Sequence, residues 1–297
     1  MADPLRLDSD WLRANPVPAP DQETDKNGRG RVVALGGSAQ VPGGIALTAE
    51  AVLRAGAGKI RVGTIGSLVV PLGLAMPEAG VIALPESDSG EIAADGLGQN
   101  PRLASSLERC DALVAGPAMS DGKAGAALVD AVLAGAAAEV TLVLDAAALE
   151  HLGERADALR ARERPVVLTP HIGEMAWLLS CEAQAIEADR AAAARAASDR
   201  FGAVVVLKGA TTLVAAPDGR LFAYAGGGVG LATGGSGDVQ AGLAAGLAAR
   251  GADPLLAALW AVWLHGEAGR RCAEQIGPLG FLARELLAHV PALLRAV

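Results

Sequence analysis

A short run of small residues that ends in an acid offers the clearest chemistry in the chain. Residues 232–238 read Ala-Thr-Gly-Gly-Ser-Gly-Asp, and an apolar helical pattern follows directly. Glycines before a helix allow an anion to approach the backbone, where the first N–H groups of the helix have no partner within it. We therefore predict an anion hole at Gly235, Ser236 and Gly237. Asp238 is predicted to act as a general base, with helix capping as the alternative.

The same segment departs from the common phosphate-binding motifs. No Gly-Lys-Ser or Gly-Lys-Thr follows the glycines, as a P-loop requires, and no G-x-G-x-x-G stands between the first predicted strand and helix. A carboxylate beside an anion hole suits phosphoryl transfer, because a base accepts the proton of the attacking hydroxyl. The pattern indicates an enzyme that uses the phosphate chain of a nucleotide.

A second segment places a lysine at the end of an apolar strand. Residues 208–212 read Lys-Gly-Ala-Thr-Thr, and ligands bind at the carboxyl ends of strands in open parallel sheets. Lys208 is predicted to face nucleotide phosphates, with Gly209 allowing close approach of the backbone. A surface lysine that opens a hairpin is the alternative.

Two further strand ends carry polar residues. Residues 168–174 read Leu-Thr-Pro-His-Ile-Gly-Glu, so Pro170 fixes an extended entry and Glu174 falls in the first turn of a helix, where the helix dipole favours an acid. We expect His171 to contact a ligand and not to transfer protons, a structural histidine being the alternative. Asp145 follows another strand, and contact with substrate or Mg²⁺ and helix capping are both open.

These segments require a sheet whose strands end at one edge. Apolar strand patterns alternate with helical patterns, which predicts an α/β fold with a mostly parallel sheet and helices on both faces. Strands are expected at 31–35, 59–63, 112–115, 141–144, 166–168 and 204–207, with a hairpin at 211–216 and 221–224. Helices are expected at 45–55, 124–137, 236–249, 254–275 and 282–294.

The chain is predicted to form one domain behind a short arm. Residues 1–27 are polar, contain prolines at positions 16, 18 and 20 and show little periodicity, so we assign them to an N-terminal polar arm or capping helix. Residues 28–297 carry the alternating pattern and are assigned to a single domain with enough apolar material for a large core.

The composition limits the classes of partner, location and metal site that we expect. The chain has 297 residues, of which 52% are hydrophobic, and a net charge of −8, so we expect no nucleic acid. We expect no membrane span and a cytoplasmic location, because no run reaches the ~20 apolar residues of a spanning helix and no secretory signal opens the chain. Three cysteines without a C-x-x-C pair favour free thiols over disulfides or zinc, and no metal cluster is visible.

Taken in order, these segments resemble the ADP-dependent NAD(P)H-hydrate dehydratase family of the ribokinase-like superfamily. The resemblance runs from about Gly30 to Leu294. The motifs that carry it lie at 36–38, 54–58, 115–117, 168–174, 207–209, 232–238 and 264–266. The motif Thr169-Pro170-His171 with Gly173-Glu174 distinguishes this family from most ribokinase-like kinases.

The resemblance implies a fold, a reaction and partners. The fold is a ribokinase-like three-layer sandwich, and the reaction converts (6S)-NADHX or NADPHX into NADH or NADPH, with ADP as phosphoryl donor and Mg²⁺ as its companion, giving AMP and phosphate. A homotetramer and a functional link to an NAD(P)H-hydrate epimerase are also implied. Residues matching hydrate-contacting positions are Gly44, Gly116, His171 and Asp238. Residues matching the nucleotide site are Lys208, Gly209, Ala210, Thr211, Thr212 and Gly237.

The sequence departs from the family pattern at three places. Gly44 stands where many relatives have Ala, and Ala118 replaces the second glycine of a Gly-Pro-Gly turn, so we expect a differently shaped substrate loop. Residues 144–147 read Leu-Asp-Ala-Ala where relatives usually have Asp-x-Asp-Ala.

Two other functions stay open from the sequence. A small-molecule kinase of the same fold, acting on a hydroxymethylpyrimidine or thiazole alcohol, would leave phosphate on its product. A non-catalytic nucleotide-binding assembly protein would keep the fold alone, although the intact Gly235, Gly237 and Asp238 argue against it.

Overall fold

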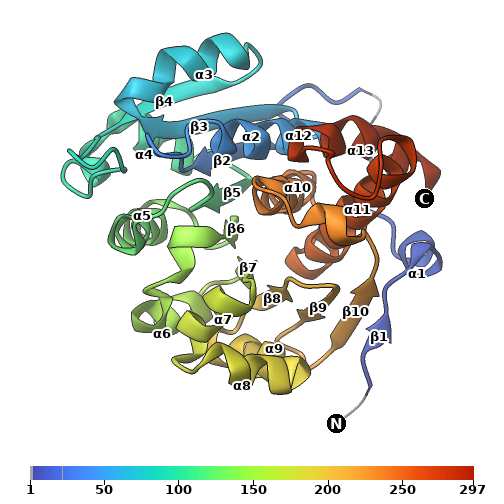
Figure 1. Cartoon of the computed structure of the whole chain (residues 1–297). Helices are drawn as coiled ribbons and strands as arrows, with labels where there is room; N and C mark the ends of the chain where they lie inside the picture. Colours follow the sequence, from blue (N-terminus) through green and yellow to red (C-terminus); the bar gives the residue numbers. More distant parts are fainter. Residues whose placement is uncertain (1–2, 22) are drawn as a thin grey trace.

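The computed structural model describes residues 3–21 and 23–297. Within this part of the chain one ten-stranded sheet forms, in the order β1-β10-β9-β8-β7-β6-β5-β2-β3-β4 (Figure 1). The strands are β1 Leu5–Arg6, β2 Arg31–Leu35, β3 Lys59–Ile65, β4 Gly80–Leu84, β5 Ala112–Ala115, β6 Thr141–Leu144, β7 Val167–Leu168, β8 Val204–Leu207, β9 Thr211–Ala215 and β10 Leu221–Ala225. All neighbours are parallel except β9, which runs antiparallel to both β8 and β10.

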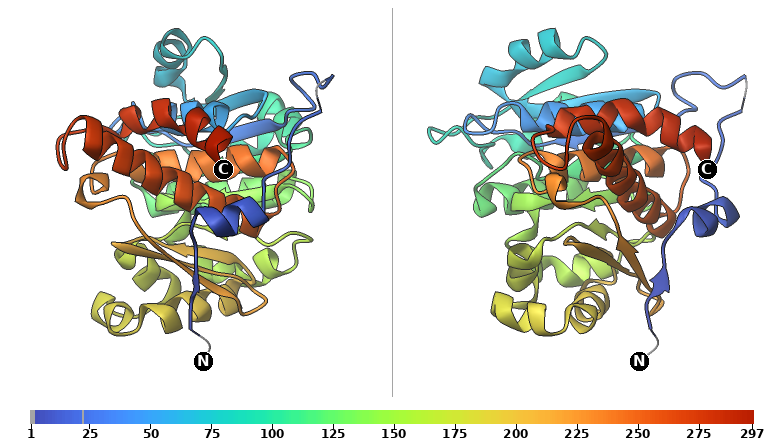
Figure 2. Two further views of the ribbon diagram at one scale, coloured as in Figure 1. Left: turned by 90° about the vertical axis from the view of Figure 1, so that its right-hand side faces the viewer. Right: turned by 45° about the vertical axis from the view of Figure 1, so that its right-hand side comes forward.

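Helices cover both faces of this sheet. The helices are α1 Ser9–Ala14, α2 Gly44–Arg54, α3 Val69–Ala75, α4 Pro101–Leu107, α5 Gly122–Gly135, α6 Ala156–Arg160, α7 Ile172–Leu179, α8 Ala183–Ala188, α9 Arg190–Phe201, α10 Ser236–Ala249, α11 Pro254–Gln275, α12 Ala283–Leu286 and α13 Val290–Ala296. Helices α2, α10, α11, α12 and α13 lie on one side, and α5 to α9 lie on the other (Figures 1 and 2). The α/β three-layer prediction is confirmed.

The central strands β5, β6, β7 and β8 are buried at every position because both their faces are covered. In β2, Val32 and Ala34 enter the core cluster shared with α2, α10 and α11, while Val33 and Leu35 enter the cluster on the opposite face. The outer strands β1, β3 and β4 also carry exposed positions.

Two glycines set how closely α10 approaches α2. A Cβ added at Gly242 would lie 2.3 Å from the Thr48 carbonyl oxygen, and one at Gly246 would lie 2.6 Å from the Val52 carbonyl oxygen. The helix backbones therefore touch, and α10 is buried along almost its whole length. Both helices begin at the same edge of the sheet, so this close packing fixes their first turns relative to each other.

The N-terminal segment is more than a polar arm. Strand β1 pairs with β10, the Trp11 ring meets Phe222 edge-on at 5.3 Å between centroids, and Leu12 is fully buried. The indole N–H of Trp260 in α11 donates to the Asn15 carbonyl at 2.9 Å. Figure 2 shows this segment running along β10 and α11. Leu7 and Leu12 are buried in the core, whereas Leu5 is exposed. The short helix α1 fits the capping-helix form of the expectation, and the division into an N-terminal segment and a domain at residue 27 stays a prediction.

Most predicted elements match the structure, including the hairpin β9–β10. The helix predicted at 282–294 is interrupted: α12 ends at Leu286, a short 3-10 turn follows, and α13 begins at Val290. Pro291 explains the break, because its ring clashes with the preceding turn and it has no N–H to continue the helix. Among the described residues no helix combines the length and the apolar character needed to span a membrane.

Candidate active site

The predicted site residues meet where β2, β5, β6, β7 and β8 end, here called the carboxyl edge of the sheet. Gly116, Asp145, Thr169 and Lys208 each follow directly or closely upon one of these strands. Helix α10 begins at the same edge (Figure 1). The parallel topology therefore gathers segments that are separated by up to 200 residues in the chain.

The anion hole has the expected backbone geometry. Gly235 is the N-cap of α10 with φ +87°, a left-handed conformation that favours glycine, and no side chain caps the helix. Of the first N–H groups of α10, that of Ser236 donates to the Thr233 carbonyl at 3.2 Å, whereas those of Gly237 and Asp238 are left for a ligand. The capping alternative for Asp238 is not observed.

The Asp238 carboxyl lies in a setting that favours its neutral form. Burial and the nearby Asp145 carboxylate raise the pKa of Asp238 to about 7, against the opposing effect of Lys208. A Cβ added at Gly44 would lie 3.0 Å from Asp238 Oδ2. Asp238 thus faces the start of α2, and a base whose pKa is near neutrality can both accept and release a proton.

Lys208 is held by an acidic network drawn from three strand ends. Its Nζ lies 2.9 Å from Asp145 Oδ1 and 3.6 Å from Glu174 Oε2, and only 21% of its side chain is exposed. The Thr169 hydroxyl donates to Asp145 Oδ1 at 2.8 Å. Burial by itself lowers the pKa of Lys208, but the charges of Asp145 and Glu174 outweigh it and raise that pKa, so the ammonium stays charged.

This network lies beside the anion hole. A Cβ added at Gly237 would be 3.4 Å from Lys208 Nζ and 3.9 Å from Asp145 Oδ2. The alternative of Lys208 as a surface lysine is wrong, because its ammonium is enclosed and ion-paired. Asp145 makes no capping hydrogen bond to the turn that follows it.

His171 caps helix α7. Its Nδ1 accepts from the Glu174 N–H at 3.2 Å, while Glu174 Oε2 accepts from the His171 N–H at 2.7 Å. Nδ1 is thus an acceptor, which assigns the ring proton to Nε2 in the neutral form. The side chain is 58% exposed, with Nε2 3.5 Å from Glu174 Oε1, so the ring has a structural role and also presents an exposed surface to a ligand. Burial raises the pKa of Glu174, against the effect of Lys208.

The loops after β2 and β5 are shaped by close backbone contacts. Gly116 has φ +103°, and a Cβ there would lie 2.0 Å from the Asp145 carbonyl oxygen, so only glycine fits. Two of the three departures from the family pattern, Gly44 and Ala118, are neighbours in space. A Cβ added at Gly44 would lie 2.6 Å from the Ala118 Cβ. Ala118 itself has φ +57°, and its methyl group occupies space that an alanine at position 44 would need.

The nucleotide segment predicted at 208–212 turns from β8 into β9. Arg190 Nη2 donates to the Leu207 and Lys208 carbonyls at 3.3 and 3.2 Å, and a Cβ at Gly209 would lie 2.4 Å from that nitrogen. Thr212 Oγ1 donates weakly to the Gly209 carbonyl at 3.4 Å. Arg190 thus fixes the loop, while Ala210 and Thr211 complete the turn into β9.

Sequence reasoning gave no role to two residues that support this edge. The Ser236 hydroxyl lies 2.8 Å from His265 Nε2, and burial together with Lys208 lowers the pKa of His265 to about 4, so the ring is neutral. Arg190 is the second. His265 had a signal in the Leu-His-Gly motif at 264–266, whereas Arg190 lies in an Ala-rich helix with no local sign of its function.

Comparison with known proteins decides the family. Residues 32–292 match a family model described as NAD(P)H-hydrate dehydratase. The chain belongs to this family. It is 48% identical to the ADP-dependent (S)-NAD(P)H-hydrate dehydratase of Xanthomonas campestris pv. campestris, over 95% of this chain and 93% of that protein. It is 38% identical to a bifunctional NAD(P)H-hydrate repair enzyme of Moorella thermoacetica, covering 97% of this chain but only 53% of that enzyme.

Solved structures agree with the family. The ADP/ATP-dependent NAD(P)H-hydrate dehydratase from Bacillus subtilis, co-crystallised with ATP and Mg²⁺, superimposes with a TM-score of 0.83 at 27% identity, covering 100% of this chain and 99% of that one. A ribokinase-like superfamily protein from Enterococcus faecalis gives 0.83 at 26% identity, covering 98% and 96%. The predictions of the family and of the ribokinase-like fold are confirmed.

Proposed function

We propose that this NAD(P)H-hydrate dehydratase family member is ADP-dependent, converting (6S)-NADHX or NADPHX into NADH or NADPH while ADP becomes AMP and phosphate. The observation that carries the proposal is the placement of Asp238, whose pKa is raised to about 7, beside an open helix N-terminus and the Lys208 ammonium. A base, an anion hole and a fixed cation are the parts that phosphoryl transfer needs.

The proposed reaction has two steps. Hydroxide is a poor leaving group, so the C6 hydroxyl of the hydrate first attacks the β-phosphorus of ADP, forming an O–P bond as the bond to AMP breaks. Asp238 accepts the hydroxyl proton. The ring nitrogen lone pair then expels phosphate from C6, and loss of a proton from the neighbouring ring carbon restores the double bond of NADH.

Each part of the carboxyl edge has a proposed role in these steps. The backbone N–H groups of Gly235 and Gly237 hold the oxygens of the migrating phosphoryl group, and the Ser236 N–H, which donates to the Thr233 carbonyl, would have to give up that bond to join them. Lys208, fixed by Asp145 and Glu174, adds positive charge beside them. Such fixed donors need no reorganisation during the reaction, which is why they stabilise the transition state better than water does.

Substrate and nucleotide are proposed to occupy opposite sides of Asp238. Gly44, whose Cα faces the Asp238 carboxyl, marks the hydrate side together with Gly116 and the exposed ring of His171. The loop 208–212 and Gly237 mark the nucleotide side.

Mg²⁺ is proposed to arrive with the nucleotide and not to be resident. Across residues 3–21 and 23–297 no group of three or more His, Cys, Asp or Glu side chains is placed to hold a metal ion. Two carboxylates of this edge, Asp145 and Glu174, are already bound to Lys208, and we assign the third, Asp238, to the hydroxyl proton. Phosphate oxygens and water are ligands that Mg²⁺ accepts readily, and the ion neutralises part of their charge.

A homotetramer, a cytoplasmic location and a separate epimerase partner complete the proposal. This chain spans about half of the bifunctional repair enzyme of Moorella thermoacetica, and the existence of bifunctional relatives supports a functional link to an epimerase. Size-exclusion chromatography with light scattering tests the tetramer.

One assay separates the candidate functions. Purified protein is mixed with NADHX, Mg²⁺ and either ADP or ATP, and NADH absorbance is followed. We expect NADH only with nucleotide, faster with ADP, and one AMP per NADH. Accumulation of a phosphorylated product without NADH would assign a small-molecule kinase, and nucleotide binding without any product would assign a non-catalytic protein.

A further inference from the structure

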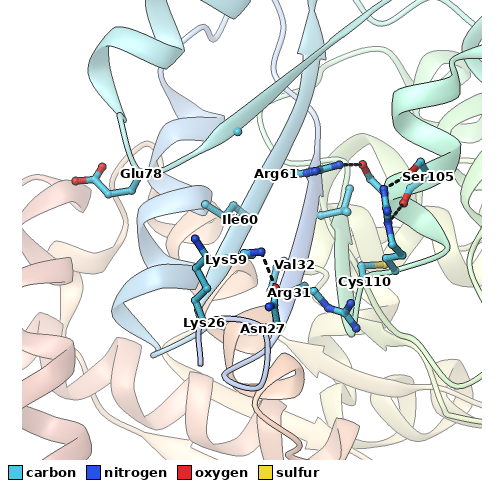
Figure 3. A pocket seen from close by; sticks show the side chains of 15 residues that line it. Lys26, Asn27, Arg31, Val32, Lys59, Ile60, Arg61, Glu78, Ser105 and Cys110 are labelled. Carbon is cyan, nitrogen blue, oxygen red and sulfur yellow. Dashed lines mark hydrogen bonds between the residues drawn. The ribbon is translucent and has the colours of Figure 1, made fainter. Parts of the chain in front are cut away.

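A second hollow lies at the opposite edge of the sheet, where β2, β3 and β4 begin, here called the amino edge. It is a cavity of about 480 Å³ that is open to solvent (Figure 3). Arg31 opens β2 at this edge, whereas Gly36 follows β2 at the carboxyl edge. Five residues of strand separate the two edges by roughly 16 Å, so this cavity is distinct from the candidate active site.

The lining of this cavity is strongly basic. One carboxylate, Glu78, faces five cationic side chains, in a chain whose net charge is −8. The cations are Lys26, Arg31, Lys59, Arg61 and Arg109. Arg31 is neutralised by Asp111, with Nη2 2.9 Å from Oδ1. Among the described residues no carboxylate oxygen lies within 4.0 Å of the other four.

Neutral groups hold three of these four cations in place instead. Lys59 Nζ donates to Asn27 Oδ1 at 2.5 Å, and Arg61 Nη1 donates to Ser106 Oγ at 2.9 Å, as the dashed lines in Figure 3 show. Arg109 Nε donates to the carbonyl of Ser105 at 2.9 Å.

Most N–H donors of these side chains remain available. An ammonium has three and a guanidinium five, and the contacts to Asn27, Ser105 and Ser106 use only a few of them. Lys59, Arg61 and Arg109 are therefore positioned without a carboxylate in contact with them, although Asp25 acts on Lys59 at longer range.

We propose that the amino-edge cavity binds a small molecule that carries two or more phosphate groups. Like charges gathered without counter-ions repel one another, and a polyanion removes that repulsion. Guanidinium groups bind phosphate oxygens through paired N–H donors. The volume is that of a small-molecule pocket, and the acidic chain as a whole disfavours a nucleic acid.

The test measures binding of inorganic pyrophosphate by calorimetry at low salt. Wild type is expected to show two classes of site, one at each edge of the sheet. The variant Lys59→Gln/Arg61→Gln should lose one class, with at least tenfold weaker binding there. The matched control Lys123→Gln/Arg295→Gln removes the same two charges from exposed positions outside the cavity and should keep both classes.

Three further measurements make the outcome decisive: a second cavity variant, the KM for ADP, and a titration with CDP. A second variant, Lys26→Gln/Arg109→Gln, changes residues outside the strands and should act in the same direction even if the first variant folds poorly. The KM for ADP should stay within twofold in all variants, since none changes a residue assigned to the nucleotide or hydrate site. Repeating the titration with CDP separates a nucleotide ligand, which binds tighter than pyrophosphate, from a phosphate chain alone. One class of site in wild type, or identical isotherms for both cavity variants and the control, would overturn the proposal.

Discussion

The two edges of the sheet handle charge in opposite ways. At the carboxyl edge one buried cation, Lys208, is paired with Asp145 and Glu174, with Asp238 close by. At the amino edge, Lys59 and Arg61 are exposed to the cavity and bonded only to neutral groups. Anions at the carboxyl edge must therefore be held largely by backbone N–H groups, whereas the amino edge offers side-chain charges.

This contrast gives a physical reason for the position of Asp238 at the carboxyl edge. Carboxylates that outnumber cations raise the pKa of a neighbouring acid, and the pKa of Asp238 is raised accordingly to about 7. A surplus of cations like that at the amino edge would lower it and weaken the base. The predictions below test this contrast, from the largest expected effect to the smallest.

The largest effect is expected from Asp238→Asn. Asparagine keeps the size of the side chain but cannot accept a proton, so turnover should fall about 10² to 10⁴-fold. ADP affinity should be unchanged or slightly better, because a negative charge near the diphosphate is removed. Single-turnover NADH formation, ADP titration and a thermal melt on one preparation measure all three. Near-normal turnover in a folded variant would leave Asp238 without a role as base.

The pH dependence follows from the same residue. The base works when ionised, so the rate should rise with pH through a midpoint near 7. The free energy of unfolding should change in the opposite direction. The folded protein holds this proton more tightly than the unfolded chain, whose carboxyl has a pKa near 3.8. The Asp238 contribution to stability therefore falls as pH rises from about 4 to about 7. Denaturant melts of wild type and Asp238→Asn across that range should converge at low pH. Parallel curves would show that Asp238 is not perturbed.

The Gly44–Ala118 contact predicts a compensating pair beside the base. Gly44→Ala should destabilise the fold by about 1–3 kcal/mol, because its new methyl group meets the Ala118 methyl. Ala118→Gly should change the free energy of unfolding little. It removes the cost of about 1 kcal/mol of a left-handed conformation at a residue with a Cβ, but glycine also raises the conformational entropy of the unfolded chain. The double variant should recover most of the loss, with a coupling energy of at least about 1 kcal/mol. Additive losses in denaturant melts would mean that the two methyl groups do not meet.

His171→Ala should weaken hydrate binding more than ADP binding, because we assign its exposed ring to the hydrate side and the 208–212 loop to the nucleotide side. The same change removes a helix cap worth about 0.5–2 kcal/mol. His171→Asn is the matched control, since asparagine restores the cap but not the ring. If His171→Asn binds the hydrate as wild type does in equilibrium titrations, the ring is structural only.

The smallest effect concerns salt. Binding of pyrophosphate to exposed side-chain cations at the amino edge should weaken steadily between 50 and 300 mM salt, because such charges are screened. The KM for ADP at the carboxyl edge should change less, since its donors are backbone groups and an enclosed lysine. Equal salt slopes for the two ligands would remove the distinction between the edges.

Local pattern alone determined much of this protein. The apolar runs at 31–35, 141–144 and 204–207 match β2, β6 and β8 to the residue, because strands buried on both faces tolerate only apolar side chains. The Gly-rich start of α10 and the family motifs could also be predicted from the sequence, because each depends only on residues that are neighbours in the chain.

Partners distant in sequence were decided only by the tertiary structure. Lys208 meets Asp145 across 63 residues, Ser236 meets His265 across 29, and Gly44 meets Ala118 from a different loop. No local pattern encodes such pairs, because they depend on which strands lie next to each other and where each one ends. The N-terminal strand was missed for a related reason: Leu5–Arg6 is too short to show a period, and only the free edge of β10 makes it a strand.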